Sequence, residues 1–425
     1  MDNKEQSKIT NAELRAAFTG ESVDTAAKAA RPKLAEAGPK KSKKLLILKI
    51  IGGLSLVGGV ACLLVAFLVF GGKKASLEYP TIPSKQADNA EYSALTGEAL
   101  AKGANVSAPT YCIQMPNGTD GARPQAGLTD AGVVFEAIAE SGITRFAAIY
   151  QDPSAAIIGP IRSLRIYYLQ WDTPFDCTIV HAGGADDALA AVSTGGYKDL
   201  SEDYTYMYRG TYGGRLWNNL FTTSTYLHKF STDHGYDSSN VKGFARLTPA
   251  ESEKQRADES VSEKLDITKA TKKDTSAVEV PVSSIALNLG GWADFNVVYN
   301  YDVDHNVYLR SYASGLAHEV YSCGIEDLGE RNPEDVCNLT QVAPSVVAVM
   351  MVQESRASDN YHEDITAIGS GDAYIFQNGL AIKGKWQKTS AEDQIKFTDQ
   401  DGKEVKLAPG QTFVTAVPNY GSVEY

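Results

Sequence analysis

Histidine and cysteine are scarce in this chain, with six and five among 425 residues. Imidazole and thiolate groups are the usual protein ligands of zinc and other transition metals, and they occur at short, regular spacings. The nearest candidate group, His228, Asp233 and His234, has no two ligands at a spacing known from metal sites. The sequence therefore predicts a protein with no metal centre and no other cofactor.

Several catalytic and nucleotide-binding motifs are also missing. Gly183-Gly184 lacks the third glycine of a dinucleotide-binding loop and the Lys-Ser/Thr pair of a P-loop. No serine or cysteine nucleophile motif is present. Asp302 begins a segment like a calcium loop, but Val307 and Ala313 stand where that loop needs glycine and glutamate. The sequence alone therefore identifies no reaction, and we lean towards a protein that is not an enzyme.

Charge is distributed unevenly along the chain. The net charge is −12, and residues 1–70 carry +5, so residues 71–425 carry −17. A region with this excess of negative charge does not suit nucleic acid or anionic lipid. We therefore expect no nucleic-acid partner.

One long apolar run is present. Residues 50–70 are uncharged and would span about 31 Å as a helix, enough for a bilayer core of about 30 Å. Five lysines precede the run and two follow it closely, which favours a cytoplasmic N-terminus. The sequence thus predicts a disordered cytoplasmic tail (1–44), one transmembrane helix (45–70) and a spacer (71–110). The protein would be a single-pass cell-membrane protein with extracytoplasmic C-terminal domains.

Four of the five cysteines lie in the region predicted to be exported. Cys323 and Cys337 bracket a polar loop, so we expect them to form a disulfide in an oxidising compartment. Cys112 and Cys177 can form a second disulfide if their strands adjoin, and otherwise they are buried thiols.

Residues 133–184 are the most strongly patterned stretch. Two alternating runs flank Ser141-Gly142, which predicts a two-residue hairpin turn with Val133 opposite Tyr150. One face is then apolar, and the other carries Glu136, Glu140 and Arg145. Arg145 could form a cross-strand ion pair on a wet face, or this face could be the floor of a binding cleft.

Two further arginines follow a turn at Gly159-Pro160. Ser163 is predicted to cap a helix that runs to about Trp171, which places Arg162 and Arg165 at the helix start. Positive charge there opposes the helix dipole, so these arginines need either a carboxylate partner or an anionic ligand. The candidate carboxylates are Glu136 and Asp152.

His181 is predicted at the carboxyl end of a short buried strand that begins at Cys177. Open α/β sheets bind ligands at this edge. His181 is therefore either a hydrogen-bonded core residue or part of a site.

Three of these segments, GLTDAGVVFEAIAESGITRFAAIY, IIGPIRSLR and CTIVHAGG, resemble the YerB-like family of bacterial extracytoplasmic proteins. The resemblance runs from about Ala122 to Val417. It implies an envelope-facing, membrane-tethered protein with an N-terminal domain of unknown function and a smaller C-terminal one. Members are often lipoproteins, but Cys62 is followed by further apolar residues, so we expect a spanning helix here rather than a lipidated cysteine.

The predicted fold is an α/β or α+β N-terminal ectodomain (111–250), a charged connection (251–280) and a smaller antiparallel β-rich domain (281–425). The tight-turn signals Asn378-Gly379 and Asp401-Gly402 support the last of these.

Three functions remain open. The first is binding of a cell-wall glycan, an anionic ligand or an envelope protein, through a cleft lined by Arg145, Arg162, Arg165, His181, Glu136 and Asp152. The second is a cell-wall hydrolase that uses carboxylates such as Glu136 and Asp152, which would have to lie about 5–9.5 Å apart. The third is a scaffold of an envelope complex. Convergence of these side chains in one open cleft favours the first two, whereas burial in mutual ion pairs favours the scaffold.

Overall fold

The structure is a computed structural model that describes residues 91–211, 216–256, 279–324 and 328–425. The predicted tail, the predicted transmembrane segment and most of the spacer lie outside these ranges. No helix within them is long and apolar enough to cross a membrane. The longest, α6 (Ser224–His234), has 11 residues, about 16 Å. The structure therefore does not support the predicted single transmembrane helix.

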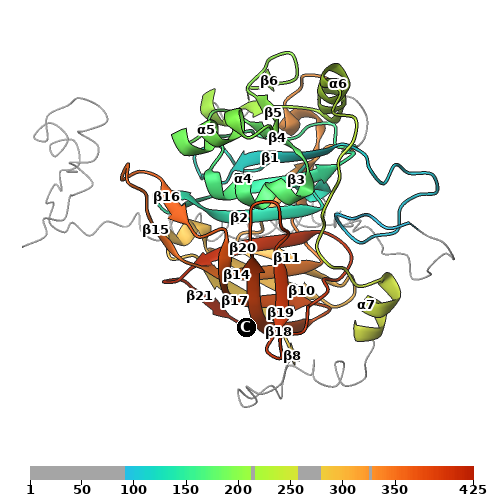
Figure 1. The fold of residues 1–425 in the computed structure, drawn as a ribbon, viewed down its shortest axis with the longest axis vertical. Helices are drawn as coiled ribbons and strands as arrows, with labels where there is room; N and C mark the ends of the chain where they lie inside the picture. Colours follow the sequence, from blue (N-terminus) through green and yellow to red (C-terminus); the bar gives the residue numbers. More distant parts are fainter. Residues whose placement is uncertain (1–90, 212–215, 257–278, 325–327) are drawn as a thin grey trace, which may run out of the picture. The chain divides into compact units, whose positions relative to one another are not determined.

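The described residues are mostly β, and their main feature is one 11-stranded mixed sheet (Figure 1). Its strand order is β19-β18-β17-β14-β20-β2-β3-β1-β4-β5, and β8 also pairs with β18. The strand bounds are β1 (Thr110–Pro116), β2 (Val133–Glu140), β3 (Ile143–Gln151), β4 (Thr178–His181), β5 (Lys198–Ser201), β8 (Glu279–Pro281), β14 (Val346–Val352), β17 (Gly369–Gln377), β18 (Leu380–Lys388), β19 (Lys396–Asp399) and β20 (Thr412–Pro418).

The predicted fold class was wrong because the two halves of the chain share this sheet. Strand β20 lies between β2 and β14 and runs parallel to both, with Thr412 opposite both Val133 and Val346. The chain therefore does not form an α/β domain with a separate antiparallel domain. Alternation within a strand does not show which distant strand it pairs with, so the sequence could not indicate this junction.

Smaller sheets and short helices complete the described structure. A four-stranded sheet has the order β11-β10-β9-β21, and three hairpins stand alone. Their bounds are β9 (Ser284–Asn288), β10 (Val297–Asp302), β11 (Val307–Tyr312) and β21 (Ser422–Glu424), then β6 (Tyr208–Arg209) with β7 (Leu220–Phe221), β12 (Glu319–Ser322) with β13 (Asn338–Gln341), and β15 (Glu354–Arg356) with β16 (Glu363–Ile365). The remaining helices are α4 (Ile166–Asp172), α5 (Asp186–Thr194), α7 (Pro249–Arg256), α9 (Pro333–Val336) and the 3-10 turns Leu128–Asp130, Thr173–Phe175, Leu216–Asn218 and Ala293–Phe295.

Strand β2 is buried along its whole length. On one face, Phe135 stacks on Trp171 of α4, with ring centroids 5.4 Å apart. On the other face, Val134 packs in a cluster with Phe146 and Phe413. A strand without a wet face must satisfy its charged side chains inside the protein, and β2 carries two of them, Glu136 and Glu140.

The β2–β3 hairpin has the predicted turn but not the predicted register. Ser141 and Gly142 both have positive φ, 50° and 79°, as a tight hairpin turn requires. The structure pairs Val133 with Ile149 rather than Tyr150, because the register shifts between Ile138 and Glu140. One extra residue on β2 forms a bulge there, which moves every earlier pair by one position.

The start of α4 also differs from the prediction. The helix begins at Ile166, and Arg165 is its N-cap, with no side-chain capping hydrogen bond. Ser163 therefore does not cap it, and Arg165 lies just outside the helix rather than in its first turn.

The structure contains the predicted Cys323–Cys337 disulfide. It also contains a Cys112–Cys177 disulfide, which the sequence had left open. Strands β1 and β4 are parallel neighbours, with Cys112 opposite Ile179, so Cys112 near the start of β1 and Cys177 just before β4 come into bonding range.

Candidate functional site

Glu136 is fully buried and forms an ion pair with Arg310 of β11, which is also fully buried. The Nη2 of Arg310 lies 2.8 Å from each carboxylate oxygen. Thr144 donates a further hydrogen bond to Glu136 at 3.2 Å. Burial alone would lower the pKa of Arg310, but the Glu136 charge together with the neighbouring Tyr299 and Tyr312 hydroxyls outweighs burial and raises it. This pair is therefore an ionic contact enclosed inside the protein.

Arg310 makes two more polar contacts. Its Nε donates to the Tyr299 hydroxyl at 3.1 Å, and its Nη1 contacts Nδ1 of His318. Burial and the Arg310 charge hold the pKa of His318 well below its ordinary value, so the ring is neutral. Its Nδ1 then accepts from Arg310, and its Nε2 donates to Gln125 at 3.1 Å.

Arg145 and Arg165 converge on one carboxylate, that of Glu140. Arg165 Nη2 lies 2.6 Å from Oε2, and Arg145 Nη2 contacts Oε1. All three side chains are buried. Burial would raise the pKa of Glu140, but the two arginine charges outweigh burial and hold it below its ordinary value. For Arg165, the predicted partners Glu136 and Asp152 were wrong. For Arg145, the structure contains a cross-strand ion pair with Glu140, one of the two glutamates on the predicted hairpin face.

Arg162 differs from its two neighbours. Within the described ranges it has no carboxylate within 4 Å, and its buried Nε has no hydrogen-bond partner. The buried Nε of Arg165 lacks a partner as well. Burial lowers the pKa of Arg162, and the nearby charges of Glu140 and Asp120 offset this only in part. One cation beside the Glu140 network is thus left without a close counter-charge.

His181 is the last residue of β4, as predicted, but its ring contacts backbone and carboxylate rather than the arginines. Its Nδ1 lies 2.7 Å from the Gly183 carbonyl, and its Nε2 lies 2.9 Å from Asp199 Oδ1. Both ring nitrogens of His181 therefore have a partner within the fold.

Asp152 does not reach Glu136. Its side chain is 63% exposed and pairs with His228 at 3.1 Å. Glu136 lies opposite Phe146, six residues before Asp152, or about 20 Å along an extended chain. A hydrolytic carboxylate pair needs about 5–9.5 Å, so the geometry excludes these two residues as that pair.

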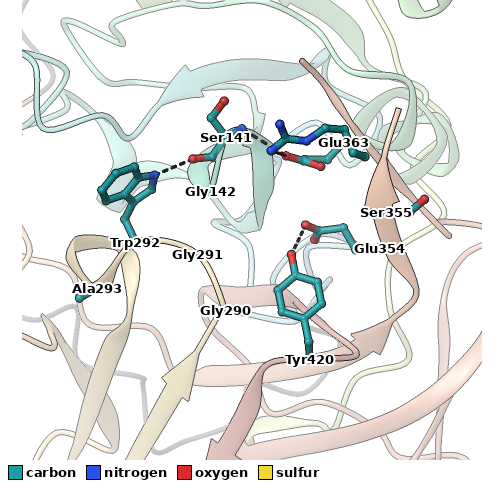
Figure 2. A pocket seen from close by; sticks show the side chains of 11 residues that line it. Ser141, Gly142, Gly290, Gly291, Trp292, Ala293, Glu354, Ser355, Glu363 and Tyr420 are labelled. Atoms are coloured by element: carbon teal, nitrogen blue, oxygen red, sulfur yellow. Dashed lines mark hydrogen bonds and ion pairs between the residues drawn. The ribbon is translucent and has the colours of Figure 1, made fainter. Parts of the chain in front are cut away.

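A pocket of about 570 Å³ lies elsewhere, between the 141–142 turn, the 290–293 loop, the β15–β16 hairpin and Tyr420 (Figure 2). We call it the Trp292–Tyr420 pocket. Its chemically active lining consists of Trp292, Tyr420, Glu354, Glu363 and Arg356. The sequence reasoning missed these residues, because they come from segments far apart in the chain. The Ser141-Gly142 turn was the only part of the lining with a local signal.

Two exposed aromatic rings line this pocket, and glycines let each pack closely. Trp292 is 66% exposed, and its Nε1 donates to the Ser141 carbonyl at 2.7 Å. A Cβ on Gly142 would lie 2.9 Å from the Trp292 ring. Tyr420 is 57% exposed, and a Cβ on Gly290 would lie 2.3 Å from its ring. Larger residues at either glycine would displace the ring.

Two carboxylates face the same pocket. The Tyr420 hydroxyl donates to Glu354 Oε1 at 2.6 Å, whereas the buried Oε2 accepts no hydrogen bond from the described part of the chain. Burial raises the pKa of Glu354 to about 7. Glu363 accepts the Ser141 N–H at 3.2 Å, and burial raises its pKa too. The pocket therefore offers two aromatic faces and two desolvated acceptors.

Fold and site together define a mostly β, disulfide-bonded protein with buried ion networks and one polar, aromatic pocket. The chain belongs to the family described as "Protein of unknown function (DUF3048)", whose N-terminal domain matches residues 95–237 and whose C-terminal domain matches residues 287–414. This confirms the resemblance to YerB-like proteins.

Two comparisons with individual proteins agree with this family. The chain is 26% identical over 301 residues to a Bacillus subtilis (strain 168) protein named "Putative lipoprotein YerB", which covers 70% of this chain and 78% of that protein. The crystal structure of YerB protein from Bacillus subtilis matches with a TM-score of 0.60 and 22% identity, over 79% of this chain and 100% of that one. At this identity, the structural match shows the fold alone.

Proposed function

We propose that this protein is a membrane-anchored, extracytoplasmic component of the bacterial cell envelope that binds a glycan in the Trp292–Tyr420 pocket. The extracytoplasmic location is supported by the name of the Bacillus subtilis relative, "Putative lipoprotein YerB". It is also supported by the Cys112–Cys177 and Cys323–Cys337 disulfides, because such bonds persist in oxidising compartments outside the cytoplasm.

The observation that carries the glycan proposal is the pairing of two exposed rings with two carboxylates in one pocket. Exposed large aromatic side chains that gather at one place mark binding sites more often than plain surface. Their flat faces complement the C–H faces of sugar rings, whereas carboxylates accept hydrogen bonds from sugar hydroxyls. Neither Trp292 nor Tyr420 belongs to a buried core cluster that would explain its position.

The test is titration of the full chain with oligomers of β-1,4-linked N-acetylglucosamine, followed by calorimetry. Trp292→Ala and Tyr420→Ala should each weaken binding by about two- to tenfold, the order of a stacking contact of about 0.5–1.5 kcal/mol. Trp217→Ala is the matched control, because Trp217 is 51% exposed and lies outside the pocket. Failure of the wild type to bind these or related cell-wall oligosaccharides would refute the proposal.

Arg162 supports a second candidate, the binding of an anionic ligand. Three arginines, Arg145, Arg162 and Arg165, gather around Glu140, and two of their Nε atoms have no partner in the described structure. A carboxylate or phosphate group at Arg162 would supply the missing counter-charge. Arg145, Arg165 and Glu136 serve the fold in this proposal, because their ion pairs are buried.

A further inference from the structure

The carboxylates of the Trp292–Tyr420 pocket outnumber its cations. Glu354 and Glu363 face one cation, Arg356. Arg356 is 54% exposed, and its Nη2 lies 3.7 Å from Glu363, beyond hydrogen-bond distance. Arg356 also directs its Nη1 to the Asn360 carbonyl at 3.4 Å. Arg356 therefore neutralises the negative charge of the two carboxylates only weakly.

Neighbouring charges outside the lining do not make up the difference. Glu140, which precedes the pocket residue Ser141, is held by Arg145 and Arg165, so those arginines are already engaged. Among the described residues, no cation lies within 4 Å of Glu354, whose Oε2 is buried without a partner. An ionised carboxylate in this position costs free energy until a positive charge approaches it.

We infer that the ligand supplies this positive charge, and that the pocket selects glycans with free amino groups over N-acetylated ones. The inference rests on the proposed glycan binding and adds the substrate class. A protonated amine offers three N–H donors, which suits Glu354 and Glu363. The faces of Trp292 and Tyr420 attract the same cation through their ring electrons. An N-acetyl group is neutral and offers one N–H, so it leaves the pocket charge uncompensated.

The experiment compares two oligosaccharides that differ only in acetylation. Tetramers of β-1,4-linked glucosamine and of N-acetylglucosamine are titrated separately into the full chain at pH 7.0. The amine form should bind at least tenfold more tightly, because hydrogen bonds between charged groups are stronger than those between neutral groups. Its advantage should shrink as salt is raised from 50 to 300 mM, because screening weakens partly exposed ion pairs.

Two variants assign the charge selectivity to the pocket. Glu354→Gln and Glu363→Gln keep the side-chain shape but remove one negative charge each, so each should lower affinity for the amine tetramer by at least tenfold. Affinity for the acetylated tetramer should fall by a smaller factor, so the preference for the amine tetramer should shrink in both variants. Glu319→Gln, at an exposed position of β12, is the matched control and should change neither.

The outcomes separate this inference from the glycan proposal. Equal binding of both tetramers would overturn the amine selectivity and leave glycan binding intact. Binding of neither tetramer would overturn both. A lysine-containing peptide is tested as a competitor of the amine tetramer. If the peptide binds more tightly than the tetramer, the pocket binds a peptide amine, and this would overturn the proposed glycan ligand as well.

Discussion

The Glu136 carboxylate and the Arg310 guanidinium meet at 2.8 Å across 174 residues of sequence. Glu136 lies on β2 of the 11-stranded sheet, and Arg310 lies on β11 of the four-stranded sheet. The pair therefore joins the two sheets through residues from opposite halves of the chain. Because both side chains are fully buried, neither charged group can be solvated by water if its partner is removed.

We therefore expect Glu136→Gln and Arg310→Met each to lower the free energy of unfolding by about 3–5 kcal/mol, since each strands one buried charge. The double variant should lose much less than the sum of the two, because it removes both charges together. Denaturant unfolding of the four proteins measures this. Additive losses would show that the two side chains stabilise the fold independently.

Glu140 should make stability depend on acid pH. Its pKa is lowered in the folded state by Arg145 and Arg165. The stabilisation is therefore complete above its unfolded pKa of about 4.3 and is lost as the pH falls through the lower folded pKa. Urea unfolding between pH 2.5 and 6 should show this decline in the wild type.

Glu140→Gln is the control for that decline. The variant should be less stable at neutral pH, because two buried arginines lose their counter-charge, and its stability should fall less steeply below pH 4.3. A pH profile parallel to the wild type would assign the acid sensitivity to other carboxylates.

Substitutions of Arg162 and Arg165 should show which arginine binds a ligand and which one stabilises the fold. Arg165→Ala removes a buried ion-pair partner of Glu140 and should lower the melting temperature by several degrees. Arg162→Ala should change it little, because Arg162 forms no ion pair among the described residues. If Arg162 binds anions, phosphate should raise the melting temperature of the wild type but not of Arg162→Ala. If phosphate, citrate and acetate all fail to raise the melting temperature of the wild type, Arg162 does not bind anions.

The two disulfides should differ in their contribution to stability. Cys323 and Cys337 are 14 residues apart, whereas Cys112 and Cys177 are 65 apart. By loop entropy, the first contributes about 3 kcal/mol and the second about 4 kcal/mol. The paired variant Cys112→Ser/Cys177→Ser should therefore lose more stability than Cys323→Ser/Cys337→Ser. Peptide mapping without reduction should find both bonds, and free thiols at either pair would contradict the structure.

The sequence predicted what local patterns determine. Ser141-Gly142 sits where a two-residue turn needs positive φ, and the turn forms there. The bulge after Ile138 left no local signal, so the register was wrong by one. The insertion of β20 beside β2 depends on a partner about 280 residues away, and no pattern within either strand indicates it.

The arginines of the candidate site could be predicted because their signal is also local. Arg145, Arg162 and Arg165 were singled out because charges at these positions need partners. The hairpin pattern placed Glu140 within reach of Arg145, but the approach of Arg165 to the same carboxylate depends on how the side chains pack after folding. Trp292 and Tyr420 gave no signal at all, because their exposure and their proximity appear only in the folded chain.

The pH dependence of ligand binding should report directly on Glu354. Its pKa is raised to about 7, mainly by burial, so in the free protein the carboxylate gains its charge as the pH rises through that value. A glucosamine tetramer with quaternised, N-trimethyl amines keeps a constant charge, so any pH effect on its binding comes from the protein. Its affinity should rise between pH 6 and 8 and then level off.

The other groups that face Glu354 do not mimic this change. Burial and Glu354 hold the pKa of Tyr420 above its ordinary value, so the phenol stays neutral. Glu363 also has a raised pKa, so the comparison needs Glu354→Gln and Glu363→Gln side by side. The rise centred near pH 7 should vanish in the first variant and persist in the second. If it persists in both, the titrating group lies outside the pocket, and Glu354 does not contact the ligand.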